Sequence, residues 1–279
     1  KLIVDTMAFS GDTVYAMARY GDWIRGGSPF PVAEALPSLG PSQKSKDFYR
    51  LWAQRDKIEK GLAAVEVLKG LAAASPQDAL TQLWVSRVYC YLGLYYTSQG
   101  NQDKKALACY QQGMRYGENA LKLMPYSVPA RYWQARNLSG WLNGAGMFKR
   151  MRYSPRILEH LLFCSRENAL YHYSGPALDM GMLMVQGDWL TRQRVKKTGI
   201  TPQVALCMLD LSAIVYPDCL EIPYVKARLL SHEGRNEEAV KIVERLLTRN
   251  PDSDRFMAPE NHCYRRMARR FLSEIKKGA

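Results

Sequence analysis

Residues 224–252 read YVKARLLSHEGRNEEAVKIVERLLTRNPD, and this stretch decides the fold. Ala227, Gly234, Ala239 and Pro251 follow one another at intervals of seven, five and twelve residues. Gly234 is expected to end one helix, because glycine adopts the left-handed conformation at the lowest cost. Pro251 is expected to end a second helix, because proline cannot continue one. Ala227 and Ala239 are small enough for the two helices to approach closely, so the stretch predicts a helix–turn–helix pair.

This spacing resembles the tetratricopeptide repeat (TPR), a helix–turn–helix unit of about 34 residues that stacks into a superhelix. The turn at residues 234–239, Gly-Arg-Asn-Glu-Glu-Ala, is typical of the turn between the helices of such repeats. The resemblance implies a stack of helix pairs with a concave face that binds other molecules.

Other stretches repeat the plan in weaker form. Residues 64–76 and 205–217 show the same twelve-residue spacing from an alanine to a proline. Residues 93–125 contain two glycines seven apart, then a second helix about two turns longer than the repeat standard. The recurrence predicts an all-α solenoid of stacked TPR-like helix–turn–helix pairs over residues 47–279. Residues 1–46 are expected to form an N-terminal helix and a Pro-rich irregular segment, with prolines at 29, 31, 37 and 41.

Residues 133–153 depart from the repeat because Gly140, Gly144 and Gly146 lie in an aromatic-rich run. One interpretation is a helix that ends near Gly144 and turns. The other is a backbone left thin so that a ligand or a neighbouring helix can come close. Gly175-Pro176 is expected to break a later pair of helices, and Gly181 to allow close packing.

Aromatic residues concentrate in the same central region. Tyrosine and tryptophan combine an apolar body with a polar tip, which suits a mixed ligand. We therefore expect a ligand-binding cavity or groove near Trp133, Trp141, Phe148, Tyr171 and Tyr173. The alternative is that these rings fill a core made irregular by the long helix that ends at Pro125.

The formal net charge of +13 favours anionic partners such as nucleic acid, acidic lipid or an acidic protein face. A basic surface without a specific partner is the alternative. The densest groups of basic residues are Lys149, Arg150, Arg152 and Arg156; Arg192, Arg194, Lys196 and Lys197; and Arg265, Arg266, Arg269 and Arg270.

Motifs for catalysis are not found. The four histidines are far apart, and neither a metal-binding HExxH nor a GxSxG, P-loop or GxGxxG motif occurs. We therefore expect no enzymatic activity, no cofactor and no metal site. The six cysteines form no CxxC pair, which fits a reducing compartment; an exported protein would need them paired or deeply buried. No run of about 18 apolar residues occurs, so we expect no membrane-spanning helix.

Three passages resemble a narrower family, the TatT-like T-component proteins associated with tripartite ATP-independent periplasmic (TRAP) transporters. They are residues 112–125 (QGMRYGENALKLMP), residues 130–149, and residues 173–187 followed by the turn at 234–239 and by Ala-Pro-Glu-Asn at 258–261. The resemblance implies a periplasmic lipoprotein of helix pairs, often trimeric, with a channel for a hydrophobic ligand near a solute-binding partner.

These observations lead to three hypotheses. The first is an exported, non-enzymatic accessory protein that binds a small apolar ligand or a transporter partner, such as a periplasmic solute-binding component, and forms a homo-oligomer. The second is a scaffold that binds a protein segment along its concave face. Its location would be cytoplasmic, as the alternative to export. The third and weakest is a basic surface that binds nucleic acid or anionic lipid.

Overall fold

The computed structural model describes residues 38–278, and within this range the chain forms twelve α-helices and no strand. The all-α prediction is confirmed. The helices are α2 (Gln43–Trp52), α3 (Ile58–Ala74), α4 (Ala79–Gln99), α5 (Asp103–Leu123), α6 (Val128–Leu142), α7 (Met147–Asn168), α8 (Tyr171–Gln186), α9 (Trp189–Lys197), α10 (Pro202–Val215), α11 (Glu221–His232), α12 (Asn236–Thr248) and α13 (Ala258–Gly278).

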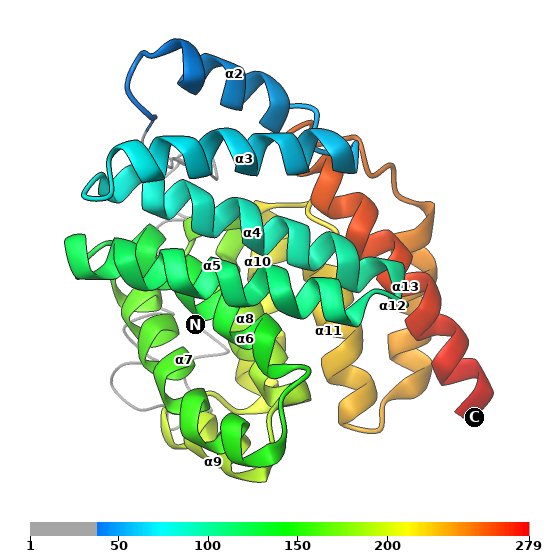
Figure 1. Ribbon diagram of the computed structural model, residues 1–279. Coiled ribbons are helices and arrows are strands. Elements are labelled where there is room, and N and C mark those ends of the chain that lie inside the picture. Colours follow the sequence, from blue (N-terminus) through cyan, green and yellow to red (C-terminus); the bar gives the residue numbers. More distant parts are fainter. Residues whose placement is uncertain (1–37, 279) are drawn as a thin grey trace.

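Consecutive helices pack side by side and form a solenoid of helix pairs, of which α4–α5, α6–α7 and α11–α12 have the most extensive contacts within the pair (Figure 1). The stretch that predicted the fold forms α11 and α12. Gly234 lies between them with φ of +79°, and Ala227 and Ala239 are fully buried. The repeat and its close helix packing are therefore confirmed for this pair.

The weaker repeats also correspond to helices. Residues 64–76 cover most of α3 and the turn after it, and residues 205–217 match α10. Gly100 caps α4 with φ of +80°, and the following helix α5 has 21 residues against 13 in α12. The difference is about two helical turns, as expected.

Helix α2 starts within the segment that the sequence assigned to an irregular loop. The Ser42 side chain accepts a hydrogen bond from the Ser45 backbone N–H and caps the helix at Gln43. Residues 43–46 are therefore helical rather than irregular. The expected N-terminal helix and most of the Pro-rich segment lie outside the described residues, so the domain division remains a prediction.

Several glycines allow helices to pack closely around side chains of this chain. Gly93 in α4 and Gly140 in α6 face the Tyr110 ring, and a Cβ atom at either glycine would lie 2.5 Å from it. Gly144 faces Leu107 in the same way. Helix α6 ends at Leu142 and the chain turns through residues 143–146, as the first interpretation of this stretch predicted. The space beside these glycines is filled by the protein itself.

The last helix closes the solenoid on itself. Helix α13 packs against α11 and α12, and also against α4 from the early part of the chain (Figure 1). Asn261 fixes its start: the Oδ1 atom accepts from the Leu220 backbone N–H, and the Nδ2 atom donates to the Asp218 and Pro251 carbonyl oxygens. The concave side of the superhelix is thereby enclosed.

Within residues 38–278, no single helix combines the length and apolarity needed to cross a membrane. Helices α9 and α10 meet both criteria only as a pair, and the chain bends by 72° between them.

Candidate functional site

The closed superhelix surrounds a central cavity of about 110 Å³ bounded by α4, α6, α8, α11 and α13. Its inner wall includes Arg87 and Trp133. The lining extends to Thr97, Asn143 and Gln186, which lie at the C-terminal ends of α4, α6 and α8. Asn143 is exposed, so the cavity reaches solvent at this end.

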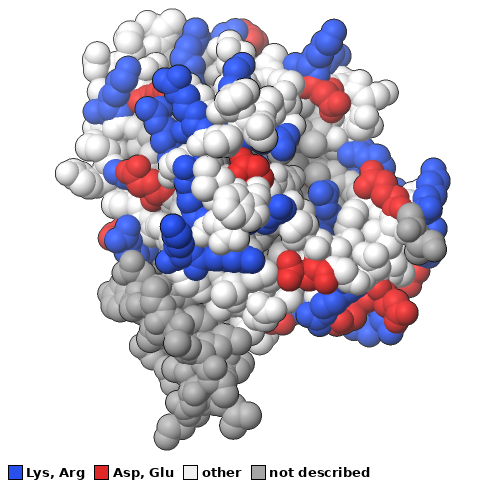
Figure 2. Space-filling view, turned by 90° about the horizontal axis from the view of Figure 1, so that it is seen from below, with Lys and Arg blue, Asp and Glu red and all other residues white. Residues whose placement is uncertain are grey.

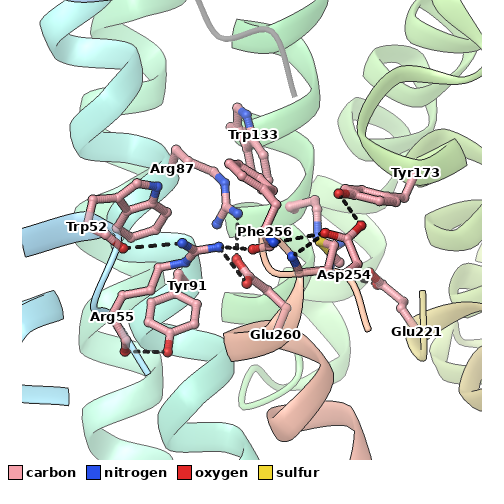
Figure 3. A network of polar contacts seen from close by, with 12 residues as sticks. Trp52, Arg55, Arg87, Tyr91, Trp133, Tyr173, Glu221, Asp254, Phe256 and Glu260 are labelled. Atoms are coloured by element: carbon pink, nitrogen blue, oxygen red, sulfur yellow. Dashed lines mark hydrogen bonds and ion pairs between the residues drawn. The ribbon is translucent and has the colours of Figure 1, made fainter. Parts of the chain in front are cut away.

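A buried ion cluster forms one wall of this cavity. The Glu260 carboxylate lies between two guanidinium groups, 2.9 Å from Arg55 and 2.6 Å from Arg87 (Figure 3). Burial alone would raise the pKa of Glu260, but the two guanidinium groups hold it below its ordinary value. The Arg55 and Arg87 guanidinium groups also lie over the rings of Trp52 and Trp133, at 4.3 and 4.2 Å from the ring centroids. The cluster therefore connects α13 to α4 and to the turn after α2.

A second charged cluster lies nearby around Arg136 of α6. Its guanidinium group is 2.9 Å from Glu221 of α11 and 3.8 Å from Asp179 of α8. It also donates hydrogen bonds of 2.9 Å to the hydroxyl oxygens of Tyr132 and Tyr264. One arginine thus connects α6, α8, α11 and α13 at the cavity wall.

Asp179 is the least satisfied member of this cluster. Its side chain is 12% exposed, and its Oδ2 atom has no hydrogen-bond partner within the described part of the chain. Burial raises its pKa from 3.8 to about 7, against the opposing effect of Arg136. Asp179 is therefore an incompletely hydrogen-bonded carboxyl at the cavity wall.

Helix α8 begins with an unusual backbone turn beside the cavity. His172, Tyr173 and Ser174 have φ of 47°, 57° and 63°, a left-handed conformation that is costly for residues other than glycine. Tyr173 donates a 2.7 Å hydrogen bond to Asp254, in the loop before α13 (Figure 3). The His172 ring packs against Trp133 with centroids 4.6 Å apart, and burial lowers the pKa of His172 well below its ordinary value. The expected break at Gly175-Pro176 thus occurs just before these two residues.

The five aromatic residues singled out from the sequence do not form one site. Trp133 lines the cavity, and its Nε1 atom donates a 3.0 Å hydrogen bond to the hydroxyl of Tyr171. Tyr173 lies in the adjacent left-handed turn. Trp141 instead packs edge-on against Tyr153, and Phe148 is 84% exposed at the start of α7. The separation arises because Trp141 lies eight residues, or roughly 12 Å, farther along α6 than Trp133, and Phe148 lies beyond the turn.

Sequence reasoning did not single out the charged residues of the cavity. They are Arg87, Arg136, Asp179, Glu221 and Glu260, together with Arg55, which pairs with Glu260. A usable signal existed for two of them, because Arg87 in VSRVYCYLGL at 85–94 and Asp179 in GPALDMGMLM at 175–184 are each the only charged residue in a largely apolar run. A charged residue on the buried face of a helix requires a partner, and partners of this kind often mark functional sites.

A second depression lies outside the superhelix, between α5, α6 and α7. This groove has a volume of about 370 Å³. Its floor contains the apolar residues Met114, Leu121 and Leu138, and its rim includes Glu118 and Arg156. The groove has a larger volume than the central cavity.

Residues 38–278 show neither a metal site nor a disulfide bond. No three His, Cys, Asp or Glu residues within this range lie close enough together to hold a metal ion. All six cysteines are free; four are buried, and Cys109 and Cys207 are half-buried. Burial raises the pKa of the Cys90 and Cys263 thiols to about 11, which disfavours the reactive thiolate.

Comparison with known proteins yields a structural likeness. No protein-family model matches the sequence, and no curated protein matches it significantly. Among solved structures, a thermophilic TPR protein from Thermus thermophilus aligns with a TM-score of 0.53 and 17% sequence identity. The alignment covers 79% of this chain and 98% of the other. Together with the observed helix pairs, this likeness shows that the chain has a TPR-like fold.

Proposed function

We propose that this chain is a non-enzymatic binding protein whose central cavity receives a small polar ligand that donates hydrogen bonds. The observation that supports it best is Asp179, a nearly buried carboxyl at the cavity wall with one oxygen lacking a hydrogen-bond partner in the described chain. A buried acceptor without a partner costs free energy that a ligand donor would recover. An ammonium or hydroxyl group would serve, and about 110 Å³ holds a small molecule or one end of a longer one.

The charged lining changes the ligand expected from the sequence. Arg136, Asp179 and Glu221 all line the cavity. An apolar ligand would displace water from these groups without replacing its hydrogen bonds, which is unfavourable. A small polar molecule is therefore a better candidate than the small apolar ligand of the first hypothesis.

Isothermal titration calorimetry with a panel of small amines, amino acids and polyols tests this proposal. Ser139→Leu would place a larger side chain at the cavity wall, and Asp179→Asn would change the acceptor. Ser273→Leu is the matched control for Ser139→Leu, because it makes the same serine-to-leucine change at an exposed position of α13. We expect a compound that binds the wild type to bind both cavity variants at least about tenfold more weakly. Its affinity for the control variant should equal its affinity for the wild type. Binding that survives Ser139→Leu would place the ligand elsewhere.

A second candidate function is a protein-interaction scaffold, which the TPR-like fold and the groove between α5, α6 and α7 support. The apolar floor and charged rim of this groove suit one side of an amphipathic peptide segment. Panning a phage-displayed peptide library on the wild type would give peptides to test. Met114→Arg, in the groove, should weaken their binding, whereas Gln111→Arg, at an exposed position of the same helix, should not. Equal binding by both variants would argue against the groove.

Export remains part of the proposal through the resemblance to T-component proteins. On that basis the protein would be a periplasmic lipoprotein anchored to the membrane, would act beside a solute-binding component and would form a homo-oligomer. Fractionation of cells that express the natural gene tests the location, and light scattering of the purified protein tests the oligomer. Recovery in the cytoplasmic fraction would favour the scaffold function.

A further inference from the structure

The start of α7 exposes an unusual number of apolar side chains. Met147 is 62% exposed, Phe148 84% and Met151 37%, all within the first two turns of the helix. Apolar side chains of this size are normally buried, and their grouping on a surface indicates contact with another apolar phase.

Helix α9 brings further residues to the same place. Thr191 bonds to Ser154 through their hydroxyl groups at 2.9 Å, and the Arg194 side chain donates to the Met151 carbonyl oxygen at 3.3 Å. Residue numbers therefore increase along α9 in the direction in which they decrease along α7, so the two helices are antiparallel. Continued by one turn, this antiparallel register brings Lys197, at the end of α9, toward the exposed start of α7.

The charge of these two segments is of one sign. Residues 147–158 and 189–200 contain eight Lys and Arg residues and no Asp or Glu. Five of the eight have no acidic partner within residues 38–278: Lys149, Arg152, Arg156, Lys196 and Lys197. Figure 2 shows the side of the molecule on which α7 and α9 lie, with many Lys and Arg side chains gathered on part of it. Arg156 shares the groove between α5, α6 and α7 with Glu118 and Glu159, which leaves four cations, Lys149, Arg152, Lys196 and Lys197, to meet external anions.

We propose that this surface, formed by Met147, Phe148, Met151 and these four cations, docks on the surface of an anionic lipid bilayer. Basic side chains flanking protruding apolar ones match the boundary between lipid headgroups and acyl chains, where each finds its own environment. A single-stranded nucleic acid would use the cations and one aromatic ring, but it gives the two methionines no comparable contact. The proposal does not depend on the central cavity and goes beyond the function proposed for it.

Vesicle sedimentation tests the proposal directly. The wild type is mixed with phosphatidylcholine vesicles or with vesicles that also contain phosphatidylglycerol, at low and at physiological salt. We expect binding only to the anionic vesicles, weakened by salt. Lys196→Glu with Lys197→Glu should lower it by more than about tenfold, since each lysine near such a surface contributes about fivefold. Phe148→Ser should lower it as well, because it removes the most exposed apolar side chain.

Matched variants on other faces control for total charge and for surface apolarity. Lys104→Glu with Lys105→Glu changes two exposed lysines of α5, and Tyr126→Ser removes a ring that is 82% exposed. These controls should bind like the wild type, and all variants should keep the wild-type circular dichroism spectrum. The proposal is overturned if anionic vesicles do not bind, if Phe148→Ser has no effect, or if the lysine controls lose as much as the α9 variant. Binding of a single-stranded RNA oligonucleotide without vesicle binding would assign the surface to nucleic acid instead.

Discussion

Replacing the cavity carboxyl by an amide, Asp179→Asn, should stabilise the protein at alkaline pH. In the folded chain the pKa of Asp179 is raised from 3.8 to about 7 by burial. The folded state therefore binds this proton more tightly than the unfolded state. The stability from the bound proton is fully present below pH 3.8 and is lost as the pH rises through 7. The two pKa values differ by an amount that corresponds to about 4 kcal/mol in the free energy of unfolding.

Asparagine cannot ionise, so the variant avoids this loss. We expect it to exceed the wild type by about 2–4 kcal/mol at pH 8, the lower figure applying if water entering the cavity solvates the carboxylate. The gain should shrink as the pH falls toward 4. Differential scanning calorimetry across this range measures it, with an expected rise in Tm of roughly 5–10 °C at pH 8.

The exposed carboxyl of Asp56 provides the control, since Asp56→Asn should give no comparable gain at pH 8. The reasoning is refuted if Asp179→Asn is less stable than the wild type at pH 8 by an amount that does not change on acidification. That result would mean that the ion pair with Arg136 outweighs burial and that the carboxylate is ionised throughout.

Three further substitutions test the packing, and a fourth, Gly70→Ala, serves as a control. Glu260→Gln removes the carboxylate from between two buried guanidinium groups and should cost about 3–5 kcal/mol in urea unfolding; a cost below about 1 kcal/mol would contradict the buried cluster. Gly93→Ala forces a Cβ atom against the enclosed Tyr110 ring and should cost about 1–3 kcal/mol. Gly70→Ala, where no atom lies within 4 Å, should be neutral or stabilise by up to about 1 kcal/mol, and equal effects of the two would show that the ring can move. Ala239→Leu should lower stability by about 1–3 kcal/mol through overpacking, and an unchanged thermal melt would show that α11 and α12 are not closely packed.

The candidate site shows how far sequence reasoning extended. Trp133 was singled out as a binding residue and does line the central cavity. Phe148 was placed with it on the basis of proximity in the sequence, but it lies exposed on another helix. An aromatic residue type indicates that a side chain is suited to binding, but it does not indicate the direction in which the side chain points. That direction depends on the residue's position around its helix and on the turn after α6.

The sequence by itself determined the helix pairs, because their signals are local. Gly234 ends a helix through its own backbone freedom, and Pro251 stops the next through its missing N–H. Neither effect needs information from distant parts of the chain.

Only the tertiary structure decided that the solenoid closes. Glu260 meets Arg55 and Arg87 across 205 and 173 residues of sequence, and no local pattern pairs them. Their meeting depends on the rotation from each helix pair to the next, a small quantity that accumulates along the stack and is set by side-chain packing at every interface. The central cavity, its buried charges and the raised pKa of Asp179 all follow from that accumulated geometry.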